Sequence, residues 1–236
     1  IVGSRLIAPG VFFTNGEDLL ALSTGKILVL GGHGDGYHLA RLDADGGVDV
    51  AFDQPDDIAG PGSGRVSVRF FSGSDARGLV VDALGEVYLG GSVTVNDDER
   101  LMLQKFSCDG SVPVSIFTDR VQTSFDVPGG TEGIGAMALQ PDGRIVMAGF
   151  HRPEGSPVQI MLLARFDPAI LPRRLDPTFG TGGWVKTDVP IANDAARAVA
   201  VQPDGRIVVV GSGGGTSDGR LVVARYLASG ALDTSF

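Results

Sequence analysis

Apolar and polar positions along this chain follow a pattern that recurs four times. The segments LLALSTGKILVLGG, LVVDALGEVYLGG, AMALQPDGRIVMAG and AVAVQPDGRIVVVG each contain an apolar run, a turn ending in glycine, and a second apolar run that closes on glycine. The turn glycines are Gly25, Gly85, Gly143 and Gly205, and the closing glycines are Gly31, Gly91, Gly149 and Gly211. Short apolar runs joined by glycine turns predict four β-hairpins.

Each repeat contains two further predicted strands. One follows the hairpin and carries a cation, in YHLARLD, LMLQKFS, MLLARFD and LVVARYL. The other precedes the hairpin, in GVFFTN, RVSVRFF, VQTSFDV and GWVKTDV. The linker LDPTFG at residues 175–180 recurs as LDTSF at 232–236 and, more weakly, as VDVAF at 48–52. We therefore expect each repeat to form a four-stranded antiparallel meander.

A single meander exposes an apolar face and two edges, so it must pack against its neighbours. We predict an all-β fold, namely a β-propeller of four antiparallel four-stranded blades, as a single domain over residues 1–236. The repeats are expected approximately at residues 10–60, 64–118, 120–180 and 183–236, with the amino-terminal strand completing the last blade and closing the ring. The alternative is half of a larger or dimeric propeller.

Composition narrows the classes of partner. Nineteen basic and 28 acidic residues give a formal net charge of −9, which repels phosphate backbones and anionic lipids. No apolar run approaches the roughly 18 residues of a membrane span. We therefore expect no nucleic-acid partner and no membrane insertion. The single cysteine, Cys108, excludes an intrachain disulfide and a multi-cysteine metal site.

The last two repeats carry AVAVQPDGRIVVVG, LVVARYLASGALDTSF and LDPTFGTGGWV, which resemble the bacterial delta-60 repeat, a β-propeller family of unknown function. The resemblance covers nearly the whole chain, but in the first two copies QPDG is replaced by LSTG and DALG. It implies a secreted or envelope-associated bacterial protein. It implies no catalytic residues, because the family has no defined set.

Three carboxylates form a candidate metal site. Asp75, Glu132 and Asp194 lie near the entry to the strands expected to be innermost. Carboxylates that converge in a ring can coordinate a hard cation such as Ca²⁺, the one cofactor candidate. The alternative is that they cap loops by accepting hydrogen bonds from backbone amides.

The loops after the closing glycines differ in length and composition, so we expect a binding rim there. Its candidate residues are His33, Asp35, Asp97, Asp98, His151, Arg152 and Asp218. Two of them, His33 and His151, occupy equivalent places in the first and third copies, opposite each other in a four-bladed ring. A shared metal or an acid–base pair is one interpretation, and ordinary exposed loop residues are the other.

Three functional hypotheses follow. The first is an extracytoplasmic binding or scaffolding propeller that recognises a protein or glycan through the variable rim loops. The second is an enzyme with a metal-assisted or acid–base site at the channel mouth. The third is a structural module of a longer repeat array. No GxSxG motif is present and Cys108 has no nearby base in sequence, so we assign no catalytic residue and favour a non-enzymatic role.

Overall fold

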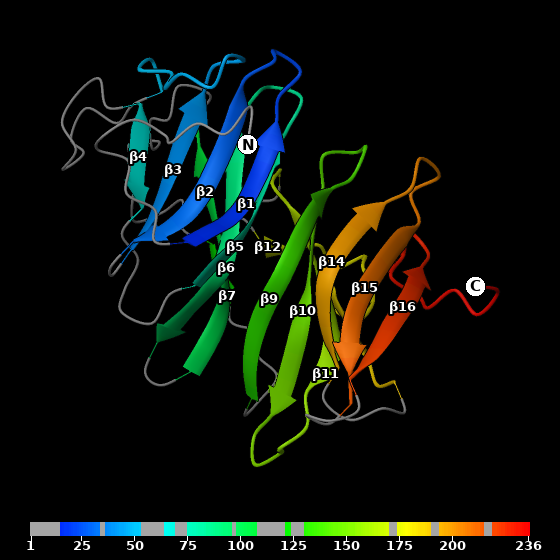
Figure 1. Cartoon of the computed structure of the whole chain (residues 1–236). Helices are drawn as coiled ribbons and strands as arrows, with labels where there is room; N and C mark the ends of the chain where they lie inside the picture. The colour runs from blue at the N-terminus through cyan, green and yellow to red at the C-terminus, as the bar shows by residue number, and fades with distance from the viewer. Residues whose placement is uncertain are drawn as a thin grey trace.

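The computed structural model is composed of β-strands joined by turns and loops (Figure 1). It describes residues 15–33, 36–52, 64–68, 75–95, 98–107, 121–123, 130–169, 174–189, 194–214 and 219–236. The all-β class predicted from the sequence is confirmed. Over the described ranges the chain forms no helix that is long and apolar enough to span a membrane.

The strands form four antiparallel sheets, which we call blades 1 to 4 in chain order. Blade 1 contains β1 (Asn15–Ala21), β2 (Ile27–His33), β3 (Gly36–Leu42) and β4 (Arg65–Val68), and blade 2 contains β5 (Asp75–Val81), β6 (Val87–Val95), β7 (Asp98–Phe106) and β8 (Val121–Thr123). Blade 3 contains β9 (Gly130–Leu139), β10 (Ile145–Pro153), β11 (Ile160–Asp167), β12 (Arg174–Leu175) and β13 (Trp184–Thr187), and blade 4 contains β14 (Ala195–Val201), β15 (Ile207–Gly213) and β16 (Arg220–Tyr226).

The hairpin turns form where the glycine repeat predicts them. All four turn glycines have positive φ, between 82° and 86°, which a residue without Cβ adopts at little cost. The Gly205 amide donates to the Gln202 carbonyl at 2.9 Å, and the Gly143 amide donates to Gln140 at the same distance. The turns therefore set the register of the first two strands in each blade.

In blades 1, 2 and 3, an outer strand comes from the following repeat. β4 pairs with β3, β8 pairs with β7, and β13 pairs with β11, so the strand that precedes each hairpin in sequence belongs to the preceding sheet. The expectation that each sequence repeat folds into its own four-stranded sheet is wrong in this respect. The segment GVFFTN, expected to complete the last blade, lies almost wholly outside the described residues, and blade 4 has three described strands.

The innermost strands β1, β5, β9 and β14 contact one another in that order and run side by side at the centre of the molecule (Figure 1). Each pair of inner and second strands has a register shift at an equivalent place, which leaves one inner-strand residue unpaired: Glu17, Arg77, Gly135 and Arg197. A β-bulge of this kind bends the strand and re-aims the extra side chain. These bulges are a property of the repeat.

Three apolar cores hold the blades together, one between each consecutive pair. Leu28 and Leu30 of blade 1 pack against Leu89 and Phe106 of blade 2. The second core joins blades 2 and 3 through Leu101, Leu103, Met147, Leu162 and Phe166, and the third joins blades 3 and 4 through Val146, Leu163, Ile207, Val209 and Tyr226. Alternate residues of a strand face opposite neighbours, so both faces of the middle blades are buried. This is the face-to-face packing of a β-propeller.

Candidate functional site

The blades have two chemically different ends. The hairpin turns lie at one end, which we call the turn end. The connections between second and third strands lie at the other, which we call the loop end, together with the starts of the inner strands. The loop end contains the residues predicted as metal ligands and those residues of the predicted binding rim that the structure describes. The turn end contains a repeated polar motif and a pocket.

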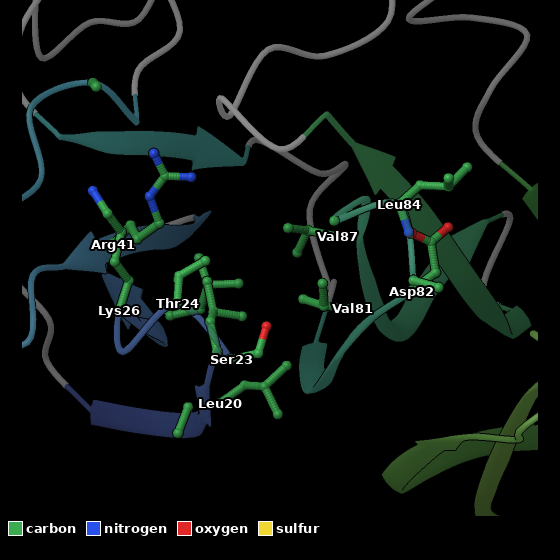
Figure 2. A pocket seen from close by; sticks show the side chains of 15 residues that line it. Leu20, Ser23, Thr24, Lys26, Arg41, Val81, Asp82, Leu84 and Val87 are labelled. Atoms are coloured by element: carbon green, nitrogen blue, oxygen red, sulfur yellow. The ribbon is translucent and has the colours of Figure 1, made fainter.

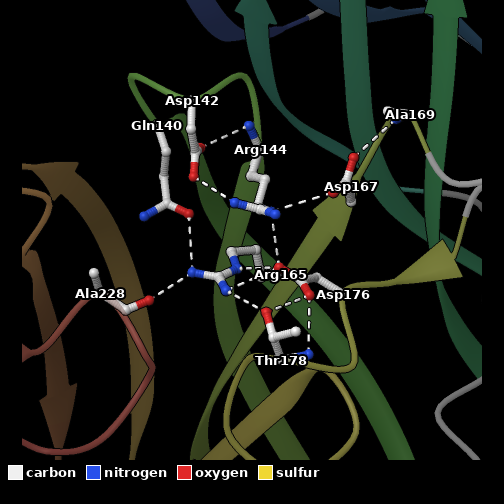
Figure 3. A network of polar contacts seen from close by, with 9 residues as sticks. All are labelled: Gln140, Asp142, Arg144, Arg165, Asp167, Ala169, Asp176, Thr178 and Ala228. Carbon is white, nitrogen blue, oxygen red and sulfur yellow. Dashed lines mark hydrogen bonds and ion pairs between the residues drawn. The ribbon is translucent and has the colours of Figure 1, made fainter.

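An Arg–Asp–Phe clasp stands at the turn end of blade 3 (Figure 3). The Arg165 guanidinium donates through Nε to Asp176 Oδ2 at 2.9 Å and lies 4.6 Å over the Phe179 ring. The backbone amide and the hydroxyl of Thr178 both donate to the other oxygen of Asp176, at 2.9 and 2.6 Å. Burial alone raises the pKa of the Asp176 carboxyl, but the hydrogen bonds from Thr178 and the charge of Arg165 outweigh burial and lower it.

The clasp recurs in blades 1 and 4, where the linker motif recurs. Blade 1 uses Arg41, Asp49 and Phe52, and blade 4 uses Arg225, Asp233 and Phe236. Hydrogen bonds from the Ser235 hydroxyl and amide lower the pKa of Asp233 to about 2.

Blade 2 replaces the clasp with another pair. Its linker lacks the aspartate, and Lys105 pairs with Glu86 at 3.1 Å. The cation of the third strand therefore has a structural partner in every blade, which favours a structural over a catalytic role for it.

The clasp of blade 3 also ties two blades together. Arg165 donates to the backbone carbonyl of Ala228 in blade 4 at 2.5 Å (Figure 3). The Gly180 amide also donates to the Ser229 carbonyl, at 2.9 Å. A hydrogen bond with a charged donor is among the stronger hydrogen bonds in a protein. The clasp thus fixes how the turn that follows β16 sits on the preceding blade.

A pocket of about 760 Å³ opens at the turn end between blades 1 and 2. Leu20 of blade 1 and Val81 and Val87 of blade 2 line its walls (Figure 2). Its volume lies within the roughly 300–1,000 Å³ of ligand sites. A small side chain helps to leave this volume open, since Ala21 occupies the position at which the other three blades have Val81, Leu139 and Val201.

The lining of this pocket is largely apolar, and its two cations are already paired. Lys26 lies 3.1 Å from Asp43 and 2.6 Å from Asp49, and Arg41 donates to Asp49 at 2.5 Å. None of the lining residues that the structure describes is aromatic. The pocket therefore offers aliphatic contacts and no stacking platform.

Leu84 is one of the residues that line this pocket, on its blade 2 side, and is 82 % exposed (Figure 2). It occupies the turn position at which blades 3 and 4 carry Asp142 and Asp204, each paired with an arginine of its own turn. A large exposed aliphatic side chain beside an apolar pocket is typical of a contact surface.

At the loop end, Glu132 and His151 form a buried pair. Their residues face each other across β9 and β10, with 2.9 Å between Glu132 Oε1 and His151 Nδ1. Burial and the nearby charge of Lys186 lower the pKa of His151, so the neutral ring donates its Nδ1–H to the carboxylate. Burial also lowers the pKa of Lys186, and the charge of Glu132 acts against that shift.

The three predicted metal ligands have separate surroundings. Asp194 is fully buried, accepts a hydrogen bond from the Val189 amide at 3.2 Å, and has its pKa raised by burial. Asp75 accepts a hydrogen bond from the Tyr37 hydroxyl at 2.8 Å and pairs with Arg77 at 2.7 Å.

The repeat register sets Asp75 apart from the other two. Glu132 and Asp194 each lie two residues before the residue that pairs with the closing glycine of their blade, whereas Asp75 lies one residue before it, and a one-residue offset reverses the face of a strand. In the part of the chain that the structure describes, no three carboxylate, histidine or cysteine side chains are grouped to hold a metal. The calcium hypothesis therefore gains no support from the geometry.

The predicted binding rim is described only in part. Asp35, Asp97 and Asp218 lie outside the described residues, and His33 and Asp98 end described strands whose terminal side chains are not described. His151 lies on β10 and is buried, so its expected place in an exposed loop is wrong.

Arg152 is the one rim candidate with a described, exposed side chain, and its guanidinium lies 5.8 Å from the Phe150 ring. The pocket at the turn end was not predicted from the sequence. The available signal was the change from Asp142 and Asp204 to Leu84 within an otherwise regular turn.

Comparison with known families supports the repeat assignment. Residues 202–236 match the model of a family described as "Domain of unknown function (DUF5122) beta-propeller". This match confirms the resemblance to a β-propeller family of unknown function that the last two repeats indicate. A search of curated protein sequences gives no match to the chain.

Solved structures show distant similarity over most of the chain. An endo-arabinase from Bacteroides thetaiotaomicron is 12 % identical, with a TM-score of 0.49, covering 98 % of this chain and 83 % of that one. A hypothetical protein from Leishmania major has 13 % identity, a TM-score of 0.46, and coverages of 89 % and 67 %. The mannose phosphorylase MPT-4 from Leishmania mexicana has 18 % identity, a TM-score of 0.44, and coverages of 91 % and 69 %. At this level of similarity no ligand or activity is transferred.

Proposed function

Since residues 202–236 match the model of a β-propeller family of unknown function, we propose that the protein is an extracytoplasmic binding or scaffolding module that captures a protein partner. The observation that carries this proposal is the apolar pocket between blades 1 and 2 with Leu84 exposed beside it. The extracytoplasmic setting rests on the family resemblance alone.

The chemistry of the pocket favours a protein over a glycan. Its described lining is aliphatic and lacks an aromatic platform, and Lys26 and Arg41 are neutralised by Asp49 and Asp43. An aliphatic side chain of an extended partner segment fits such a surface, with Leu84 covering the flank of the inserted group. An anionic ligand finds no unpaired cation among these described residues.

The enzyme hypothesis has less support from the described residues. Glu132 and His151, the pair best suited to acid–base chemistry, are both almost completely buried and bind each other. A general acid or base has to reach its substrate. We therefore assign this pair a role in fixing the loop end of β9 and β10. Recognition through the rim loops remains an alternative surface for the same binding function.

The experiment is a peptide selection against the pocket. Peptides displayed on phage are selected on the wild-type chain, and their Kd is measured by fluorescence polarisation for the wild type and for Leu84→Asp. We expect selected peptides to depend on one aliphatic residue and to bind L84D at least tenfold more weakly. The variant restores the residue type of blades 3 and 4 at an exposed site, so folding is preserved.

A matched control separates the pocket from general surface hydrophobicity. Leu227→Asp changes an exposed leucine in blade 4, away from the pocket lining, and leaves the Kd unchanged. Equal affinity of the selected peptides for wild type and L84D contradicts the pocket as the binding surface. Binding that is instead lost on Arg152→Ala assigns capture to the rim, and binding of oligosaccharides but no peptides contradicts the protein partner.

A further inference from the structure

In the part of the chain that the structure describes, the two outermost faces of the blade stack expose apolar side chains. On the inner strands, Leu19, Leu79 and Met137 occupy equivalent positions that face the preceding blade. Leu79 and Met137 are 3 % and 8 % exposed because a blade covers them, whereas Leu19 is 68 % exposed. Among the described residues no blade packs on this face of blade 1, which thus presents the residue type that the repeat buries elsewhere.

Blade 4 shows the complementary pattern on its far face. Leu221 and Val223 of β16 correspond to Met161 and Leu163 of β11, which are fully buried against blade 4. Leu221 is 76 % exposed and Val223 is 45 % exposed. The phenylalanine of the clasp follows the same trend, since Phe236 is 61 % exposed whereas Phe52 and Phe179 are inaccessible to solvent.

The charges at the centre of the stack are also complementary across these two faces. Within the chain, the bulge residues of blades 1 and 2 pair, since Arg77 of blade 2 lies 2.8 Å from Glu17 of blade 1, whereas the bulge residue of blade 3 is the uncharged Gly135. The bulge residue of blade 4 is Arg197, which is exposed. A blade 1 placed after blade 4 therefore brings the acidic Glu17 toward the basic Arg197, which is an attractive contact.

We propose that the far face of blade 4 docks onto the open face of blade 1 in a second copy of this chain, and reciprocally. The docking surface continues an interface that the chain already forms three times, with the same residue types on both sides. Two copies related by a two-fold axis satisfy all four open faces and close one ring of eight blades. Burial of the exposed leucines and of Phe236 supplies the driving force.

The internal interfaces predict the contacts between copies. Met137 lies so close to Gly78 that a Cβ at the glycine would be 2.4 Å from Met137 Cγ. The equivalent pair across the new interface is Leu19 with Ala198. Arg165 donates to the Ala228 carbonyl of the following blade, so Arg225 is expected to donate to the Ala44 carbonyl of the second copy.

The first test is the mass of the chain in solution, measured by light scattering after size-exclusion chromatography. We expect twice the chain mass of 24.4 kDa. Leu19→Glu alone, and Leu221→Glu with Val223→Glu, each change exposed residues and are expected to give folded monomers. Leu84→Glu, at a residue that is 82 % exposed but lies on neither end face, keeps the doubled mass. A wild-type monomer or an open-ended polymer overturns the proposal.

Mixing the two monomeric variants tests the orientation. A pair of L19E with L221E/V223E retains one wild-type interface, between blade 4 of the first and blade 1 of the second. We expect the equimolar mixture to recover the doubled mass, which neither variant shows alone. Contact between two copies of blade 4 instead predicts that L19E stays dimeric, and that result overturns the proposed docking.

A disulfide distinguishes docking between copies from closure within one. Leu19→Cys and Ala198→Cys are introduced together with Cys108→Ser, and the oxidised protein is examined on a non-reducing gel. We expect a covalent dimer, with each single-cysteine variant remaining monomeric on the gel. A disulfide confined to one chain shows that blade 4 closes on its own blade 1 and overturns the proposal.

Discussion

At the scale of the residue, the clasp shows how two charged side chains and a phenylalanine are accommodated together inside the protein. Arg165 and Asp176 are almost inaccessible to solvent, and they are acceptable inside the protein because Thr178, Gln140 and the Ala228 carbonyl satisfy their remaining hydrogen-bonding groups. The cation–π contact with Phe179 adds to the same arrangement. The repeated linker was visible in the sequence, but the cation that completes it lies on another strand.

Asp176→Asn tests the clasp. The substitution removes one charge of a buried pair and leaves Arg165 without its counterion, so we expect a loss of about 3–5 kcal/mol in the free energy of unfolding. Asp142→Asn is the matched control, because Asp142 also pairs with an arginine, at 2.6 Å, but is half-exposed. A surface pair contributes about 1 kcal/mol or less. Urea unfolding of both variants measures the difference, and equal losses contradict a special role for the clasp.

At the scale of the element, the glycine repeat predicted the hairpins because each turn requires a positive φ. The assignment of outer strands failed for a physical reason. The apolar pattern of β4, β8 and β13 suits pairing with the sheet before them as well as with the sheet after them. The local sequence of each strand therefore does not determine which of the two sheets it joins.

The candidate site was less predictable than the elements. The length of β10 determines whether His151 lies in a loop or a strand, and the size of the pocket depends on side chains from two blades. Neither property follows from one repeat alone. Glu132 was identified from its acidic character, whereas its pairing with His151 depends on strand register.

Two glycines of blade 3 test two different requirements, the positive φ of the hairpin turn and the close approach of two strands at the bulge. Gly143 has φ +86° and open space where a Cβ would lie, so Gly143→Ala costs only its backbone conformation, about 1–2 kcal/mol. At Gly149 a Cβ would lie 1.9 Å from the Gly133 carbonyl oxygen, beside the bulge. We expect Gly149→Ala to destabilise the chain more than G143A in urea unfolding. The reverse order contradicts the close strand approach at the bulge.

At the scale of the whole molecule, the three clasps make stability depend on pH in one direction. The pKa of Asp233 is lowered from 3.8 to about 2 by hydrogen bonds from Ser235. In Asp49 and Asp176 burial opposes the lowering, but the hydrogen bonds and the neighbouring arginines prevail. A carboxylate with a depressed pKa in the folded state contributes stability above its unfolded pKa and loses it as pH falls through the folded value.

We therefore expect the urea midpoint to fall between pH 4 and pH 2 as the clasp aspartates bind protons. Asp233→Asn removes one of these titrating groups, so its midpoint is lower than that of the wild type at pH 7 and the two curves approach each other toward pH 2. Asp142→Asn is the comparison variant. The pKa of Asp142 is also lowered, by hydrogen bonds from Arg144 and against the effect of burial, but this carboxyl belongs to an exposed turn and not to a clasp. Curves for wild type and D233N that stay parallel from pH 7 to pH 2 assign the acid sensitivity to groups outside the blade 4 clasp.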